Sequence, residues 1–288
     1  MELRQNVLLR PKTTMRIGGT ARYFAELKSK ADTEEILRFS VDQKLRIIPL
    51  GSGSNTIFAD GEIEAIVIQV KYDAVTIDEN RVTVGAGKNL PMLINELAGV
   101  GLDLSPLTGI PGTVGGAIFG NAGQGPKGIW MDTFVESVTA YGDGEWKVFP
   151  KNDCHFRYRE SVFKDSLSPL IIWDTTLTVP SGDPETIKTN IESLLKKRIE
   201  TQPHMKTAGS CFKAVGDTPA WQLIDAAELR GLRIGGIEIS PKHANFLINV
   251  GEAAFRDALE LVENVRKEVP QGLEVEMRFV GNDGSLKV

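Results

Sequence analysis

The chain has 288 residues, of which 41% are hydrophobic and 25% are charged, and its formal net charge is −5. These values are ordinary for a globular protein and exclude a disordered chain, a collagen-like repeat and a coiled coil. The small negative charge argues against a surface that wraps nucleic acid. Its apolar runs, such as residues 65–68, are too short to span a membrane. The unusual number is 29 glycines, about a tenth of the chain, where about 7% is usual.

The number of cysteines and the first residues of the chain indicate the cellular compartment to expect. Cys154 and Cys211 are the two cysteines, too few for a disulfide framework or a multi-cysteine zinc site. The first residues lack the charged-then-apolar pattern of a signal peptide. We therefore expect a cytoplasmic protein with reduced thiols. The histidines and cysteines lack the spacing of metal ligands, so we expect no metal site.

Short strands and glycine turns dominate the first 180 residues. β-Branched runs and hairpin turns predict strands. The predicted strands are 45–50, 65–70, 74–77, 81–84, 137–141, 145–149 and 170–179. Helices are predicted between them at 33–42 and 91–98. This order indicates an α+β fold with mixed or antiparallel pairing, because a regular βαβ repeat is missing.

A change of pattern follows at residues 180–185, where we place a domain boundary. Asp183 and Pro184 are a good N-cap and first-turn pair, so a long helix is predicted from there to about residue 200. After a polar loop the predicted elements are a helix at 221–229, a strand at 245–250, a helix at 253–269 and a strand at 273–280.

The first glycine-rich loop, residues 49–56, follows a predicted strand. Its glycines can direct backbone N–H groups at a phosphate, because they tolerate unusual φ and carry no Cβ. It is not a Rossmann fingerprint, since Thr56 stands where the third glycine would be. It is not a P-loop either, since no Gly-Lys-Ser/Thr follows. Taken alone, the loop is equally consistent with a tight turn.

A second loop, residues 109–117, has four glycines in nine residues, and a third glycine-containing segment lies at 14–19. Glycine has a high entropic cost on folding, so a purely structural segment rarely uses so many. Together these segments suggest an extended dinucleotide. Arg16 could then pair with its pyrophosphate.

Six segments resemble the UDP-N-acetylenolpyruvoylglucosamine reductase family, the MurB flavoenzymes that make UDP-N-acetylmuramate for peptidoglycan. These segments are 13–24, 49–58, 108–123, 156–164, 209–213 and 243–281. They occur in the family's order, and the resemblance extends over nearly the whole chain. The resemblance implies an α+β protein with an FAD-binding domain of the vanillyl-alcohol-oxidase (PCMH) type at 1–182, in subdomains of about 1–72 and 73–182. A C-terminal α+β substrate-binding domain would follow at 183–288.

The resemblance also implies non-covalent FAD, with NADPH as the hydride donor. The first glycine loop would hold the FAD pyrophosphate and the second would line the flavin. The FAD contacts expected on this basis are Arg16, Gly51, Ser52, Gly53, Ser54, Asn55, Thr56, Gly109, Ile110, Pro111, Gly112, Thr113, Gly115, Gly116 and Ala117. The length favours the shorter type II form, without the additional tyrosine-bearing lid loop.

Three residues match the catalytic positions of the family. Arg159 stands in the Tyr-Arg-x-Ser motif, Ser210 is the expected proton donor, and Glu276 is the expected catalytic carboxyl group. From the residues alone, each has a plainer interpretation. The first could lie in an exposed turn, the second could be a hydrogen-bonding turn residue, and the third could face solvent. Alternation in residues 273–279 puts Glu276 on one strand face with Glu274 and Arg278.

Substrate contacts are expected at Tyr158, Lys213 and His243. The family motif continues Lys-Asn-Pro, whereas Ala214 follows Lys213 here, so one expected substrate-contacting amide is missing. Cys211 lies next to the expected proton donor and is interpreted as a small packing residue.

The activity implied is NADPH-dependent reduction of UDP-N-acetylglucosamine enolpyruvate to UDP-N-acetylmuramate through FAD. Arg159 and Glu276 would stabilise the developing enediolate, and Ser210 would protonate C2. The expected partners are small molecules, the UDP-sugar nucleotide and NADPH. Two alternatives stay open: a related FAD-dependent oxidase, and a nucleotide-binding module without activity. The glycine loops contain no histidine or cysteine, which excludes covalent flavin attachment there.

Overall fold

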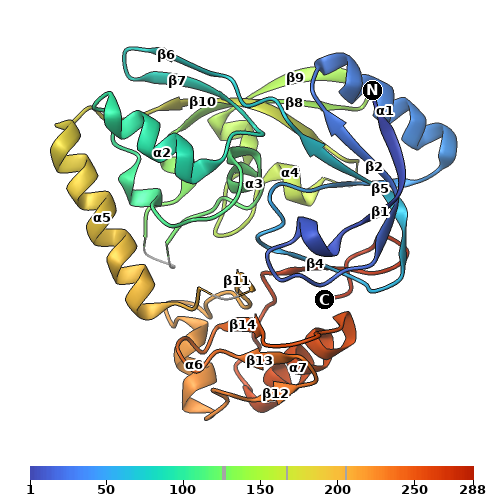
Figure 1. Ribbon diagram of the computed structural model, residues 1–288. Helices are drawn as coiled ribbons and strands as arrows, with labels where there is room; N and C mark the ends of the chain where they lie inside the picture. Colours follow the sequence, from blue (N-terminus) through green and yellow to red (C-terminus); the bar gives the residue numbers. More distant parts are fainter. Residues whose placement is uncertain (125–127, 167, 205) are drawn as a thin grey trace.

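The computed structural model describes residues 1–124, 128–166, 168–204 and 206–288. Within these residues the strands form three sheets of four or five strands and one two-stranded pair. Figure 1 shows the first two sheets side by side, with the C-terminal sheet beneath them. Helix α5 (Pro184–Thr201) runs along one side, from the second sheet to the C-terminal sheet. No helix in the described ranges is both long and apolar enough to cross a membrane.

The first sheet has mixed pairing. In spatial order it contains β1 (Leu3–Leu8), β2 (Thr20–Leu27), β5 (Glu62–Val70) and β3 (Arg46–Pro49). β1 is antiparallel to β2, while β2 and β3 are both parallel to β5. Helix α1 (Lys30–Gln43) connects β2 to β3, and Ser29 begins it with a capping box to Asp32. Its buried Ile36 packs on the face of the sheet that carries Ile66 and Ile68.

The second sheet is antiparallel. Its order is β6 (Val75–Asp78), β7 (Arg81–Gly85), β10 (Ile171–Thr178), β8 (Val135–Gly142) and β9 (Glu145–Pro150). Asp143 and Gly144 join β8 to β9 and both have positive φ, as a type I′ hairpin turn requires. Three helices belong to this part of the chain: α2 (Leu90–Gly99), α3 (Val114–Phe119) and α4 (Val162–Asp165).

The C-terminal part begins with helix α5 (Pro184–Thr201), and Asp183 Oδ2 accepts a hydrogen bond from Thr186 N at 2.8 Å as its N-cap. The antiparallel sheet here has the order β11 (Thr207–Ser210), β14 (Phe246–Asn249), β13 (Ile237–Ile239) and β12 (Arg233–Ile234). Helices α6 (Ala220–Ala226) and α7 (Phe255–Glu268) accompany it. Short 3₁₀ helices occur at Arg10–Lys12, Ser105–Leu107, Met131–Thr133 and Lys151–Cys154.

A parallel pair of short strands brings the end of the chain back to its beginning. β15 (Arg278–Val280) pairs with β4 (Thr56–Phe58), which directly follows the first glycine loop. One hydrophobic cluster accordingly contains buried residues from both ends, such as Phe24, Phe58, Phe212 and Phe279. The first sheet and the C-terminal sheet therefore share a core.

The predicted helices and strands lie where expected, with one correction at residues 273–280. Burial alternates there as predicted, with Leu273, Met277 and Phe279 buried, but the regular strand is confined to Arg278–Val280. Residues 274–276 pair only with 211–213, where Phe212 and Val275 form an isolated bridge. Among the described residues, 274–276 form no continuous ladder with 211–213, because residues 211–213 follow the end of β11 and are not a regular strand.

Candidate active site

A cavity of about 870 Å³ lies where the two glycine loops, helix α5 and the C-terminal sheet meet. Its volume is in the usual range for a ligand pocket. Arg159, Ser210 and Glu276, the three expected catalytic residues, all line it. Arg159 lies in the segment after β9, Ser210 ends β11, and Glu276 lies just before β15. The fold thus brings together residues that are far apart in the sequence.

The glycine loops form one side of this cavity and touch each other. All the expected FAD contacts in the two loops line the wall. A Cβ on Gly51 would lie 2.6 Å from Thr113 Oγ1, and one on Gly112 (φ +113°) would lie 2.9 Å from Ser54 Oγ. Thr113 caps α3, since its Oγ1 accepts a hydrogen bond from Gly116 N. A cradle this close needs residues without side chains.

The position of Arg16 does not support its expected FAD contact. It is exposed and is not among the described residues that line the cavity. Its Nη1 donates a hydrogen bond to Pro11 O at 2.8 Å, and this contact keeps the guanidinium at the surface. Thr14, from the same segment, lines the cavity instead, and its hydroxyl donates to Thr207 O at 2.6 Å.

Arg159 and Glu276 form an ion pair inside the cavity. Arg159 Nε lies 3.1 Å from Glu276 Oε1, and the two side chains are 14% and 15% exposed. Arg159 Nε is nevertheless buried without a hydrogen bond to any described residue, because the contact is not aligned for one. Burial raises the pKa of Glu276, although the positive charges of Arg159, Lys164 and Lys213 oppose the rise. The protonated form of Glu276 is thus less unfavourable here than it is in water.

The backbone around Glu276 is held from two sides. Glu276 N donates to Cys211 O at 2.7 Å, in the segment that follows β11. Asn55 Nδ2, from the first glycine loop, donates to Glu276 O at 3.1 Å. The backbone of Glu276 is therefore held against both the glycine loop and the Ser210 segment.

Ser210 ends β11 and pairs with Phe246 of β14. Asn245 then holds the residues after it. Phe212 N donates to Asn245 Oδ1 at 2.9 Å, and Asn245 Nδ2 donates back to Phe212 O at 2.8 Å. Cys211 is fully buried in the hydrophobic core, as its interpretation as a packing residue predicts, and burial raises the pKa of its thiol.

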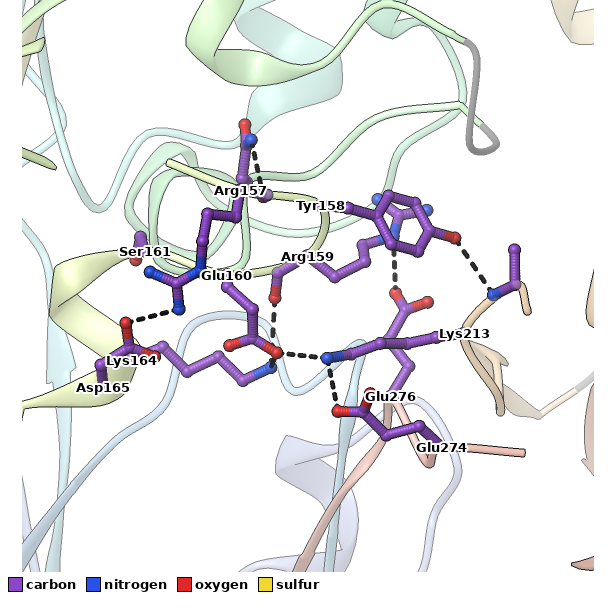
Figure 2. A network of polar contacts seen from close by, with 12 residues as sticks. Arg157, Tyr158, Arg159, Glu160, Ser161, Lys164, Asp165, Lys213, Glu274 and Glu276 are labelled. Atoms are coloured by element: carbon purple, nitrogen blue, oxygen red, sulfur yellow. Dashed lines mark hydrogen bonds and ion pairs between the residues drawn. The ribbon is translucent and has the colours of Figure 1, made fainter. Parts of the chain in front are cut away.

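A network of charged side chains lies beside the ion pair (Figure 2). Lys213 Nζ donates to Glu160 Oε1 and to Glu274 Oε1, the latter at 2.6 Å. Lys164 Nζ donates to the same oxygen of Glu160 at 2.9 Å. Lys213 is not among the described residues that line the cavity, so its expected substrate contact is not supported. Two carboxylates bind its ammonium group instead.

The other two expected substrate contacts do line the cavity. The hydroxyl of Tyr158 accepts a hydrogen bond from Ala214 N at 3.4 Å (Figure 2). His243 Nδ1 accepts one from Asn245 N at 3.3 Å. Burial lowers the pKa of His243, so the neutral imidazole is favoured at neutral pH.

Two arginines in the wall were not identified from the sequence. Arg278 Nη1 donates to Pro49 O at 3.1 Å, and burial lowers its pKa to about 10. Its place on the same predicted strand face as Glu276 was a signal that could have found it. Arg198 Nη1 donates to Gly109 O at 2.6 Å. That residue stands in an ordinary amphipathic helix and gave no signal.

The wall fits an extended dinucleotide such as FAD. The glycine loops leave a cradle that a Cβ would fill, and both loops line the same cavity. Thr207 lines the cavity, and its Oγ1 is buried without a hydrogen bond among the described residues, so a ligand could supply its partner. In the part of the chain that the structure describes, no group of three or more His, Cys, Asp or Glu side chains could hold a metal ion.

Known proteins match both parts of the chain. Residues 202–279 match the UDP-N-acetylenolpyruvoylglucosamine reductase C-terminal domain, and residues 21–149 match an FAD binding domain. A UDP-N-acetylenolpyruvoylglucosamine reductase from Dinoroseobacter shibae is 36% identical over 93% of this chain and 91% of its own length. This chain belongs to that family.

Further relatives agree with this assignment. A family member from Carboxydothermus hydrogenoformans is 34% identical over 95% of this chain and 91% of its own length. The crystal structure of MurB from Thermus caldophilus superposes with a TM-score of 0.83 and 32% identity, over 96% of this chain and 98% of the other. The expected fold class is confirmed. The chain is a flavin-dependent oxidoreductase with FAD as its cofactor, which favours the reductase over both alternatives considered from the sequence.

Proposed function

We propose that the chain catalyses the NADPH-dependent reduction of UDP-N-acetylglucosamine enolpyruvate to UDP-N-acetylmuramate, in peptidoglycan precursor synthesis. The observation that carries this proposal is the largely buried contact between Arg159 and Glu276, which lie in one cavity with Ser210 and both glycine loops. FAD, when bound, supplies the chemistry of hydride transfer from NADPH to the vinyl C3 of the substrate.

Arg159 and Glu276 are proposed to stabilise the charge that develops on the substrate. Adding a hydride to C3 leaves negative charge at C2, and this charge spreads into the carboxylate. Fixed donors aimed at such charge stabilise a transition state most effectively in a site that excludes water. The guanidinium of Arg159 offers a permanent positive charge there. Glu276 acts as a hydrogen-bond donor in its protonated form, the form that its burial favours.

Ser210 is proposed to donate the proton that completes the reaction at C2. A hydroxyl group has a very high pKa, so it can protonate only a strongly basic centre that is held close. The Asn245 hydrogen bonds beside Ser210 support this role, because they hold the segment rigid. Tyr158 and His243, both in the wall, are proposed to contact the substrate.

We further propose that residues 183–288 form the substrate-binding domain, after FAD-binding subdomains at about 1–72 and 73–182. The three larger sheets support this division, because each is built from strands within one of these ranges. The proposed substrates, a UDP-sugar and NADPH, support a place in the cytoplasm.

Anaerobic spectroscopy of the flavin tests the proposed function in two steps. NADPH is expected to bleach the bound flavin, and UDP-N-acetylglucosamine enolpyruvate is expected to restore its colour. Recolouring by oxygen but not by the enolpyruvyl substrate would indicate an oxidase. A flavin that NADPH does not bleach would indicate a binding module.

A further inference from the structure

Glu160 lies between the segment that carries Arg159 and the segment that carries Lys213. It is not among the described residues that line the cavity. One oxygen of its carboxylate, Oε1, accepts hydrogen bonds from Lys164 Nζ and from Lys213 Nζ. Figure 2 shows these contacts directly beneath Arg159. The side chains of Glu160 and Lys213 are 19% and 9% exposed. The two contacts are thus largely shielded from solvent.

Each lysine also contacts a segment that carries one of the groups proposed to stabilise the substrate charge. Lys164 Nζ also donates to the carbonyl oxygen of Arg159 at 3.1 Å. Arg159 has φ +61°, a left-handed conformation that is unfavourable for a residue with a Cβ and needs support from its surroundings.

On the other side, Lys213 belongs to the segment that holds Glu276. Lys213 N donates to Glu274 O at 2.8 Å, and Glu276 N donates to Cys211 O at 2.7 Å. Lys213 is therefore only two residues from the backbone partner of Glu276 and pairs with the same segment.

We propose that Glu160 is a positioning residue for the reduction of the enolpyruvyl substrate. By bridging Lys164 and Lys213, it ties the strained loop that carries Arg159 to the segment that carries Glu276. This inference rests on the proposed function, because it assigns Glu160 to the step in which those two groups act. Glu160 acts through Arg159 and Glu276 and does not itself touch the substrate.

Glu160 also balances the charge near Glu276. The charged and titratable groups around Glu276 are Arg159, Glu160 and Lys164 from one segment, Cys211 and Lys213 from a second, and Glu274 and Arg278 from its own. Lys164 and Lys213 both oppose protonation of Glu276. Without the negative charge of Glu160, the positive charges of the two lysines would act on Glu276 more strongly. They would stabilise its ionised form and lower its pKa.

Glu274 binds the same lysine but cannot replace Glu160 in this role. Its side chain is 69% exposed, against 19% for Glu160. Water and salt screen an exposed carboxylate strongly. Glu274 also has no hydrogen bond from Lys164 in the described part of the chain, so it cannot connect Lys213 to the Arg159 loop.

The test is Glu160→Gln in the FAD-bound enzyme, with the two half-reactions measured separately. Flavin reduction by NADPH is expected to stay within about twofold, while reoxidation by saturating enolpyruvyl substrate slows about tenfold, because Arg159 and Glu276 are no longer held together. The pH at which reoxidation falls to half is also expected to move down, because Glu276 loses its proton more readily. A merely structural weakening would not move that pH.

The matched control is Asp165→Asn. It makes the same carboxylate-to-amide change in the same segment, where it breaks the exposed ion pair of Asp165 with Arg157 at 2.7 Å. The control is expected to keep wild-type rates and pH dependence in both half-reactions. If Glu160→Gln matches the control, the positioning role is wrong although the proposed function stands. If the wild-type enzyme itself is not reoxidised by the substrate, the proposed function is wrong.

A second pair of variants decides the matter should Glu160→Gln fail to fold. Lys213→Met is expected to slow reoxidation at saturating substrate, and Lys213→Arg, which can still bind both carboxylates, is expected to restore it. A change in KM alone in Lys213→Met would make Lys213 a substrate contact and would overturn the bridge.

Discussion

Neighbouring residues at this site have opposite surroundings, and burial decides what each can do. Ser210 faces the cavity, while the next residue, Cys211, is buried in the core. Glu276 is enclosed enough for its pKa to be raised, whereas Glu274, two residues earlier, is 69% exposed. Residue type alone would have favoured the thiol over the hydroxyl as an acid. The position of each side chain reverses that preference.

Replacing Ser210 with alanine is expected to separate the two half-reactions. Flavin reduction by NADPH needs no proton from Ser210 and should stay near the wild-type rate. Reoxidation by the enolpyruvyl substrate should slow by about two to four orders of magnitude, the usual effect of removing a general acid. Stopped-flow absorbance of the flavin measures both. Ser193→Ala, on the exposed face of α5, serves as the control, and an equal loss in both half-reactions would contradict the assignment.

The two cysteines are expected to resist alkylation in the folded protein. Both are buried, and burial raises the pKa of Cys154 to about 12 and raises that of Cys211 as well. Because only the thiolate reacts, little of the reactive form exists at pH 8. Mass spectrometry after iodoacetamide treatment should find both thiols unmodified. The same treatment in guanidinium should modify both, and rapid labelling of native Cys211 would rule out its packing role.

At the scale of elements, the glycine loops owe their function to the segments behind them. Gly53 has φ +66°, and its carbonyl accepts a hydrogen bond from Thr14 N at 3.1 Å. A Cβ at Gly53 would collide with the carbonyl oxygen of Lys12. The first loop is thus packed against the N-terminal segment on one side and open to the cavity on the other.

Gly53→Ala is expected to weaken FAD binding by about tenfold or more, since backbone strain of about 1–3 kcal/mol would displace the loop. Gly144→Ala is the control, because Gly144 also has positive φ (+84°) but a Cβ there meets nothing within 4 Å. That control should be destabilised by about 1–2 kcal/mol through φ alone and keep its FAD affinity. Fluorescence titration of the apoprotein with FAD measures both affinities. If Gly53→Ala and Gly144→Ala bind FAD with equal affinity, the prediction that this glycine is needed for FAD binding is wrong.

At the scale of the whole molecule, the C-terminal segment completes the N-terminal part. β15 pairs with β4, and one hydrophobic cluster includes residues from both ends of the chain. The carboxyl group of Glu276 reaches the cavity because β15 begins two residues later, beside the first glycine loop. Cofactor loop, catalytic segment and core are therefore parts of one structural unit.

Phe279→Ala is expected to lower the free energy of unfolding by about 3–5 kcal/mol, because it removes a fully buried aromatic ring. Since the core is shared, the first and C-terminal sheets should still unfold in one transition at a lower temperature. Differential scanning calorimetry measures both quantities. Leu286→Ala, which truncates a 54% exposed side chain, should change little. Two separate transitions in Phe279→Ala, one of them unshifted, would show that the two sheets are independent.

Local signals were sufficient to predict most of the elements and part of the site. Asp183–Pro184 marked the start of α5, and alternation at 273–279 placed Glu276 with Arg278. Ordered motifs indicated Arg159, Ser210 and Glu276. The expected ligand contacts of Arg16 and Lys213 stay predictions, because their partners in the fold, Pro11 O and two carboxylates, depend on geometry that a motif does not contain.

The sequence by itself determined the glycine loops, the helix starts and the family, because these depend on residue types at short spacings. Only the tertiary structure decided which side chains share the cavity and which pair with one another. Glu160, Lys164, Lys213 and Glu274 come from three separate segments of the sequence, yet the fold joins them into one network beside Arg159 and Glu276. Burial and distance control the strength of charged contacts, and both quantities exist only once distant segments have packed together.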